Sequence, residues 1–261
     1  MPLFIRQQTG IRPTHAAERF LREAATGADL LRQAAKIMAS GRRGFGGDIR
    51  VGLIASLSQG FLASLLAEYH RRFPSVTVEI DEDASEINVA GVLNGRLDVA
   101  FVTGVPRVPK CNSYHLWDER IYVALPSSHR LAAEQRLSWT QVRNEVFLVS
   151  ASGPGPEIEN YLIAKLSGLG FRPHIHLQRV GRENLVNLVA CGFGLTLTTE
   201  STLGARCGGV AFIPLDATSE IVSSSVLWRH GNENPALKAM LELSKEMRSS
   251  LRFRTKRAEH V

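Results

Sequence analysis

Residues 48–101 carry the pattern that most constrains the fold of this chain. The predicted elements are, in order, a strand at 49–54, a helix from Phe61 to the Phe73-Pro74 pair, a strand at 76–80, a helix at 85–95 and a strand at 97–101. Alternating apolar residues indicate the strands, and apolar residues three or four positions apart indicate the helices. This order favours a parallel sheet with right-handed crossovers.

The second half of the chain repeats the same order of elements. It predicts a strand at 146–149, a helix at 158–166, a strand at 175–180, a helix at 183–190 and a strand at 195–198. Later strands are expected at 210–215 and 222–228, and a terminal helix from Pro235 to Ser250. Two extended segments, near 121–126 and 216–226, would join the two halves. The sequence therefore predicts an α/β fold with two lobes, hinged around a cleft.

The first loop of this pattern holds the first candidate binding residues. Ser56 and Ser58 follow the strand at 49–54, and ligands bind beyond the carboxyl ends of strands in open parallel sheets. Ser58 is a suitable N-cap for the next helix, and a helix N-terminus suits a carboxylate or phosphate. The alternative is that Ser58 only caps its helix and Ser56 only faces water.

A long helix is predicted ahead of the first lobe. Thr14 is its expected N-cap, and small or apolar residues recur at helical spacing to about Ser40, over roughly 39 Å. Its apolar stripe needs a partner, because a lone helix of this composition is marginally stable in water. The glycine-rich segment 41–47 follows and is expected to be a flexible hinge. A phosphate-binding loop is the less suitable interpretation, since this segment precedes a strand.

The charge of the chain is concentrated at its two ends. The net charge is +6, with +5 in residues 1–50, +4 in residues 245–261 and −3 between them. Basic ends can contact nucleic acid or can serve only as solubilising tails. Cys111, Cys191 and Cys207 are widely spaced, which fits a reducing compartment rather than a disulfide framework. Because no signal peptide or membrane span is recognised, we expect a cytoplasmic protein that binds no membrane.

The sequence offers no catalytic constellation. It contains no GxSxG, HExxH or P-loop motif, so we expect neither an enzyme nor a cofactor. His174 and His176 would share one face of a strand, but a third ligand is missing nearby, so no metal is expected. Cys191 lies in an apolar context typical of a buried structural thiol. Asp98 could be mistaken for a catalytic carboxylate, and we expect it to pair with backbone or a nearby basic group.

Six short stretches, in order, resemble LysR-type transcriptional regulators. They are Pro2-Leu3-Phe4-Ile5-Arg6 with Thr14-x-Ala16, Gly52 with the serine-rich loop, Phe73-Pro74-x-Val76, Gly95-x-Leu97-Asp98-Val99-Ala100, Leu125-Pro126-x-x-His129-x-Leu131 and Leu188-Val189-Ala190-x-Gly192-x-Gly194. Ala17 and Thr199 depart from the family, which usually has Gly and Pro there. The family also begins with a winged helix-turn-helix, whereas this sequence starts inside the wing.

The resemblance implies a type II periplasmic-binding-protein-like effector domain behind a linker helix. The expected regions are a remnant of the DNA-binding wing at 1–12, a linker and dimerisation helix at 13–41, a hinge at 42–47, an effector domain at 48–251 and a basic tail at 252–261. Lobe I would comprise 48–122 and 223–251, and lobe II 123–222. We expect a homodimer or homotetramer that binds promoter DNA only in a full-length form. Arg6 and Arg12 could contact phosphates, but base readout needs the missing recognition helix.

The expected ligand is a small organic anion in the cleft between the lobes. The residues expected to bind it are Ser56 and Ser58 in the first loop, Thr103 at the opposite strand end, Ser150 and Ser152 in the second-lobe loop, and Arg182 and Thr196 on the floor. The alternative function is a solute-binding protein of a transport system, which would need a signal peptide and would leave the linker helix unexplained. An enzyme on the same fold would need convergent titratable groups, and hydroxyls predominate here.

Overall fold

The computed structural model describes residues 3–7, 10–14, 17, 20–21, 24–25, 27–28, 31, 47–205, 207–215 and 220–258, with the backbone alone at 5–7, 10–12 and 250–258. The chain divides into two compact units, Met1–Gly47 and Asp48–Val261. Among the described residues, no helix is both long enough and apolar enough to cross a membrane.

The smaller unit begins with a hairpin. Strands β1 (Phe4–Gln7) and β2 (Gly10–Pro13) pair antiparallel. The Ala17 N–H donates to Thr14 Oγ1 at 3.2 Å, which confirms Thr14 as the predicted N-cap. The described residues from Ala17 to Leu31 have helical backbone. The remainder of the predicted linker helix and residues 42–46 of the predicted hinge lie outside the described residues.

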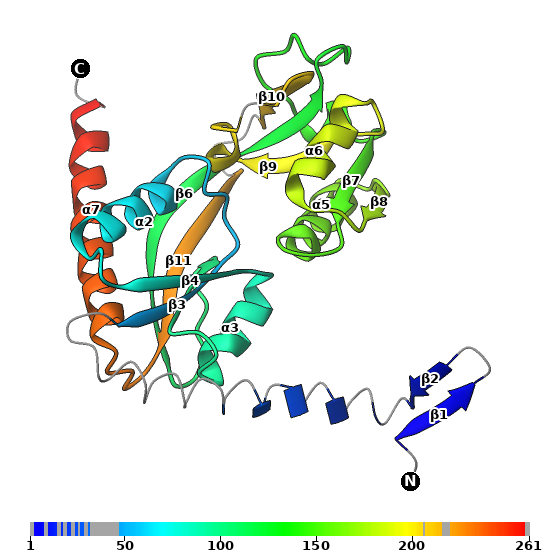
Figure 1. Ribbon diagram of the computed structural model, residues 1–261. Coiled ribbons are helices and arrows are strands. Elements are labelled where there is room, and N and C mark those ends of the chain that lie inside the picture. Colours follow the sequence, from blue (N-terminus) through cyan, green and yellow to red (C-terminus); the bar gives the residue numbers. More distant parts are fainter. Residues whose placement is uncertain are drawn as a thin grey trace. The chain divides into compact units, whose positions relative to one another are not determined.

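The first predicted pattern is confirmed in the larger unit (Figure 1). Its elements are β3 (Asp48–Leu53), α2 (Phe61–Arg72), β4 (Thr77–Glu82), α3 (Ser85–Leu93) and β5 (Val99–Thr103). Strand β3 lies between β4 and β5 and is parallel to both, as predicted. The carboxyl ends of these strands therefore lie at one edge of the sheet.

The repeated pattern is also confirmed. Its elements are β7 (Val146–Ser150), α5 (Gly155–Gly168), β8 (His174–Gln178), α6 (Arg182–Ala190) and β9 (Thr196–Thr199). Strands β7 and β8 are parallel, and Leu195 forms a parallel bridge to Phe147 on the other side of β7. The next residues turn away, because β9 pairs antiparallel with β6 instead.

The long strand β6 (Cys111–Pro126) was only partly predicted. Its first half pairs with β11 (Ile221–Arg229), and its second half pairs with β9 and with β10 (Val210–Pro214), all antiparallel. The sequence indicated a strand from Arg120 only and a connection before it. Polar residues crowd the stretch from Cys111 to Arg120, so its alternation is weak, and pairing with β11 decides its conformation.

Three smaller differences concern helices. The short helices α4 (Trp139–Val142) and η1 (Glu200–Thr202) were not predicted. They are a single turn each, too short to produce a periodic pattern. The terminal helix α7 (Pro235–Ala258) continues past the predicted end at Ser250.

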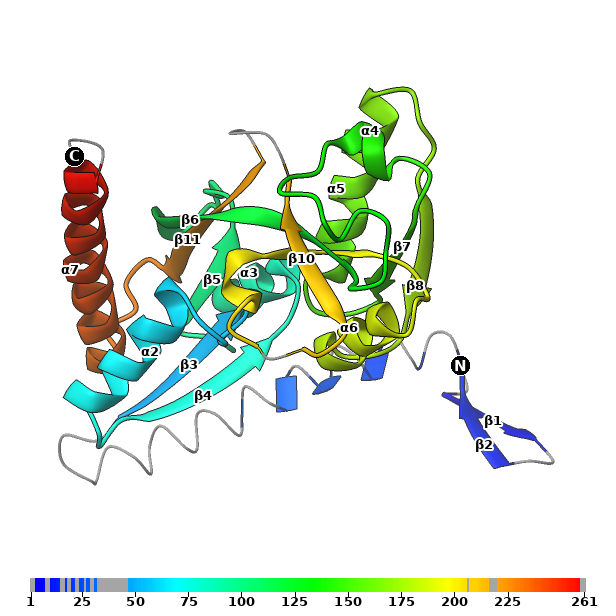
Figure 2. The same cartoon turned by 90° about the horizontal axis from the view of Figure 1, so that it is seen from above.

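Two large hydrophobic cores define the two lobes. The first-lobe core lies between β3 and β5 and the helices α2 and α7, and includes Leu65, Tyr69 and Met240. Helix α3 covers the other face of that sheet through a smaller cluster around Val92 and Leu97 (Figures 1 and 2). The second-lobe core lies between β7, α5 and the second half of β6. Strand β6 contributes Leu116 and Trp117 to the first core and Val123 and Leu125 to the second.

Asp98 joins three separate segments of the first lobe. Its Oδ2 accepts the Arg50 backbone N–H at 2.9 Å and the Arg50 Nε–H at 3.2 Å, and its Oδ1 accepts from Asn232 Nδ2 at 3.3 Å. The expectation that Asp98 pairs with backbone or a basic group, rather than acting in catalysis, fits these contacts.

We predict that Asp98→Ala destabilises the first lobe by about 3 kcal/mol, because it leaves the largely buried Arg50 guanidinium unpaired. Urea denaturation followed by circular dichroism would measure the loss. The matched control is Asp81→Ala, which breaks the more exposed ion pair with Arg96 and should cost less than about 1 kcal/mol. Equal losses in the two variants would contradict this account.

Candidate functional site

A cavity of about 420 Å³ lies between the two lobes. The first lobe contributes the residues that follow β3, the end of β4 and the end of β5. The second lobe contributes the loop from Ser150 to Gly155 and the first turns of α5 and α6. Strands form the remaining wall, with Ile121 of β6 and Val222 of β11 from the connecting strands and Leu197 of β9 from the second lobe. A cavity of this size at such a junction suits a small molecule.

Six of the seven predicted binding residues line this cavity. They are Ser56, Thr103, Ser150, Ser152, Arg182 and Thr196. Ser58 does not line it. The structure therefore brings together side chains from both halves of the sequence, as the strand-end rule for open α/β sheets predicts.

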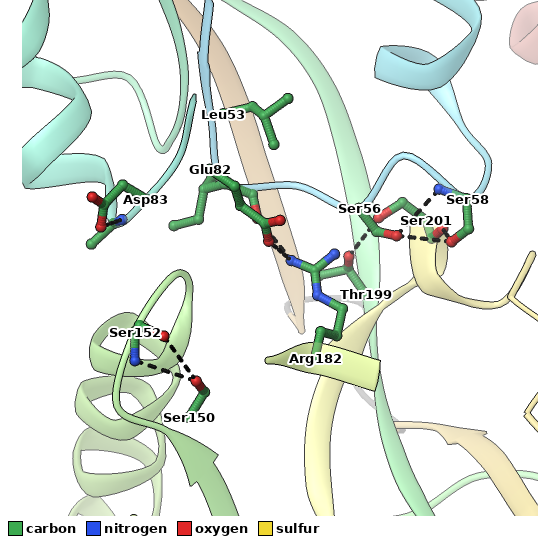
Figure 3. A network of polar contacts seen from close by, with 12 residues as sticks. Leu53, Ser56, Ser58, Glu82, Asp83, Ser150, Ser152, Arg182, Thr199 and Ser201 are labelled. Atoms are coloured by element: carbon green, nitrogen blue, oxygen red, sulfur yellow. Dashed lines mark hydrogen bonds and ion pairs between the residues drawn. The ribbon is translucent and has the colours of Figure 1, made fainter. Parts of the chain in front are cut away.

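Ser58 points to a neighbouring backbone rather than to its helix. The Ser58 hydroxyl donates to the Ser201 carbonyl at 2.7 Å, and Ser56 Oγ lies 2.8 Å from Ser58 Oγ (Figure 3). Because the Ser58 proton is used by Ser201, Ser56 is the donor in the contact between the two serines. The prediction of Ser58 as N-cap is wrong, since α2 begins at Phe61 with Gly60 at the cap and no side-chain cap.

The second-lobe hydroxyls are also bonded to the protein. Ser150 Oγ donates to the Val180 carbonyl at 2.8 Å and accepts the Ser152 N–H at 3.3 Å. Thr196 Oγ1 donates to the Leu148 carbonyl at 2.7 Å, and this residue is almost fully buried. The contacts between Ser150 and Ser152 (Figure 3) and the bond to Val180 fix the loop after β7, so this part of the cavity wall is ordered by the protein's own contacts.

The helix starts that face each other across the cleft differ from those predicted. From the sequence, the helix starts after Ser58 and after Pro156 are expected to face each other across the lobes, but residues 58–60 do not line the cavity. Gln59 Nε2 and Ser58 Oγ are instead bound to the carbonyls of Glu200 and Ser201 in η1. The first-lobe helix opposite α5 is α3, whose Ser85 N–H donates to Glu157 Oε1 of α5 at 2.9 Å.

Carboxylates are the cavity residues that the sequence analysis missed. Glu82, Asp83, Glu119 and Glu157 all line it, although the serine-rich loops themselves hold no acids. Three of these carboxylates accept a hydrogen bond from a backbone N–H group. Asp83 accepts from Ala84, Glu119 from Ser201 and Glu157 from Ser85. Glu82 is the last residue of the parallel strand β4 and Asp83 follows it, so the strand-end rule could have identified both.

Arg182 is the one cationic side chain among the described residues that line the cavity. It starts α6 in the second lobe and reaches across to the first (Figure 3). Its Nη2 donates to Glu82 Oε1 at 2.9 Å and to the Ile54 carbonyl at 3.2 Å. The guanidinium therefore ties the end of β4 and the segment after β3 to the second lobe.

A buried carboxylate lies beside the cavity in the second lobe. Glu220 is 5% exposed and accepts hydrogen bonds from Lys165 Nζ, at 2.7 Å, and from the Tyr161 hydroxyl. Burial alone would raise the pKa of the Glu220 carboxyl, but the bonds from Lys165 and Tyr161 outweigh burial and hold this pKa below its ordinary value. Burial and the adjacent Glu220 raise the pKa of the Tyr161 hydroxyl. Tyr161 itself lines the cavity.

Metal-ligating side chains do not gather in the part of the chain that the structure describes. No group of three or more His, Cys, Asp or Glu there could hold an ion. His174 and His176 lie on β8 and are exposed. The cavity chemistry is thus that of hydroxyls, carboxylates, one guanidinium and an apolar wall.

Comparison with known proteins gives a consistent result. The profile of the family described as "LysR substrate binding domain" matches residues 42–249. The regulator TtuA of Agrobacterium vitis is 27% identical over 202 residues, which cover 75% of this chain and 66% of that protein. The chain thus spans just under two thirds of the length of that relative.

Two solved structures share the fold. The crystal structure of CbnR, a LysR family transcriptional regulator, has a TM-score of 0.73 and 21% identity, covering 90% of this chain and 81% of that one. The effector-binding domain of BenM, solved with its effector benzoate, has a TM-score of 0.68 and 23% identity, covering 79% and 94%. The predicted α/β fold with two periplasmic-binding-protein-like lobes is confirmed.

We predict that Glu220→Gln lowers the free energy of unfolding by about 3 kcal/mol at pH 7, since it leaves Lys165 without its carboxylate. The folded pKa of Glu220 lies below its ordinary value, so its contribution is present above about pH 4.5 and is lost as the pH falls below that. Urea unfolding at a series of pH values should therefore show the two proteins converging in acid. Glu134→Gln, at an exposed site, is the control and should follow the wild type.

Proposed function

The chain belongs to the LysR substrate-binding-domain family, and we propose that it is the effector-sensing part of a LysR-type transcriptional regulator. The observation that carries this proposal is the cavity between two lobes in a chain of this family. The relatives are transcriptional regulators, which are not enzymes, and they favour this function over a solute-binding protein of a transport system. Because such a regulator works where the DNA is, we place it in the cytoplasm.

The proposed effector is a small organic anion. The first turns of α5 and α6 line the cavity, and the leading amides of a helix favour negative charge. Arg182 adds a guanidinium, which matches the geometry of a carboxylate. The apolar wall suits the hydrocarbon body of such a ligand, and the effector of BenM is the carboxylate benzoate. The negative charges of Glu157 and Glu119 are partly balanced by the hydrogen bonds that these carboxylates accept from backbone N–H groups.

The proposed mechanism is a shift between two lobe arrangements. A ligand that contacts both lobes binds one arrangement more tightly and raises its population. In a full-length form this shift would change how DNA-binding domains reach promoter DNA. The side chains of Arg6 and Arg12, proposed to contact phosphates, lie outside the described residues. The division into wing, linker, hinge, two lobes and tail given above is part of this proposal.

We predict that carboxylates stabilise the protein through the cavity. In a thermal-shift assay, benzoate should raise the melting temperature, whereas its neutral and cationic counterparts benzamide and benzylamine should not. Ser56→Ala should weaken binding of the effective carboxylate by roughly ten- to a hundredfold, because the Ser56 hydroxyl would turn from Ser58 Oγ to the ligand and donate one charge-assisted hydrogen bond.

The control for that substitution is Ser64→Ala. Ser64 is exposed on α2, bonds to the Gly60 carbonyl of its own helix, and does not line the cavity, so its loss should change affinity little. If benzylamine alone stabilises the protein, the proposal of an anionic effector and the role given to Ser56 are both wrong.

Self-association through the linker helix is a second prediction. Phe20, Leu21 and Leu31 have helical backbone and expose 58%, 44% and 75% of their surface. Their burial between two chains would stabilise a dimer or tetramer. Light scattering should find an oligomer for the intact chain and smaller assemblies for one that starts at Gly47. A monomeric intact chain would contradict the partner-helix interpretation.

A further inference from the structure

The contact between Arg182 and Glu82 is the one place where opposite charges meet across the cavity among the described residues that line it. Arg182 belongs to α6 of the second lobe and Glu82 to the end of β4 in the first. Their side chains are 29% and 50% exposed, so neither is locked into the core. The pair therefore joins the lobes and yet remains accessible from the cavity.

This pair leaves an anionic ligand without a cation of unbalanced charge among the described residues of the cavity. Of these residues, Arg182 is the one that carries a positive charge, and Glu82 balances it. The carboxylates of Glu119 and Glu157 are held by backbone amides and do not compete for the guanidinium. Glu82 is held by the Nη2 donor of Arg182, so a carboxylate that takes this donor must displace Glu82, because two carboxylates at one N–H group would repel each other.

We infer that Glu82 is an internal occupant of the anion subsite and determines how tightly the cavity binds acids. This inference rests on the proposed function of anion sensing. When a carboxylate ligand arrives, it replaces Glu82 on Arg182, and the half-exposed Glu82 side chain turns to water. Arg182 can bind a planar carboxylate through two parallel N–H donors, so the subsite selects carboxylates over less matched anions.

The exchange also changes which atoms hold the lobes together. Before it, the tie between α6 and β4 is made within the protein. After it, α6 is tied to the ligand, and the ligand's other contacts with the first lobe complete the connection. Glu82 thereby sets both the affinity for acids and the strength of the lobe contact in their absence.

The test is a double-mutant cycle measured by isothermal titration calorimetry with benzoate, succinate and lactate. Glu82→Gln removes the competing charge and keeps the shape of the side chain, so the carboxylate that binds the wild type should bind about two- to fivefold tighter, the worth of a partly exposed ion pair. Arg182→Met should weaken binding. In the Arg182→Met background, Glu82→Gln should have no further effect.

The control is Glu86→Gln, which removes the same charge from an exposed site of α3 outside the cavity and should leave affinity unchanged. If Glu82→Gln binds carboxylates no tighter than the wild type, or if its gain in affinity persists in the Arg182→Met background, the exchange of Glu82 for the ligand is refuted. The proposed function still stands in that case, provided that the wild type binds a carboxylate. If no carboxylate binds any variant, both proposals fail.

Discussion

The strand β6 is shared by both lobes, and most of the architecture depends on that sharing. Its first half lies against β11 in the first lobe, and its second half lies against β9 and β10 in the second. Side chains of the same strand enter both cores. The lobes are therefore connected by hydrogen-bonded strands rather than by a loose linker, and the cavity lies beside this connection.

Polar contacts also join the lobes, both at η1, where Ser58, Gln59 and Glu119 bond to backbone groups, and at more exposed sites of the cavity. Arg182 to Glu82 and Glu157 to the Ser85 amide link the lobes at the cavity. Such contacts contribute little net free energy each, so a ligand of modest affinity can outweigh them. A sensor of small molecules requires both features. The shared strands hold the lobes together, and the weak contacts allow a ligand to change the arrangement of the lobes.

The order of strands and helices could be predicted because alternation and helical spacing are local properties. Six of the seven chosen binding residues line the cavity, and the strand-end rule accounts for those in the loops after β3 and β7 and for Thr103 at the end of β5. The prediction of Ser58 as a binding residue and helix cap was wrong because its hydroxyl bonds to the Ser201 carbonyl, 143 residues away in the chain. The first half of β6 was not predicted for the same reason, since its strand conformation depends on pairing with the distant β11. Glu119 and Glu157 could not be placed at the cavity from the sequence either, because the Ser201 and Ser85 amides that they accept from are distant in the chain.

The pairing of β6 with β11 has a consequence for how the chain folds. Arg120 faces Ile221 in that ladder, so the whole second lobe is a loop of about a hundred residues between adjacent strands. The first lobe also needs α7, from the end of the sequence, to complete its core. During synthesis the second lobe has all its parts while the first still lacks β11 and α7. We therefore expect the lobe encoded in the middle to form first and the lobe that begins the domain to close last.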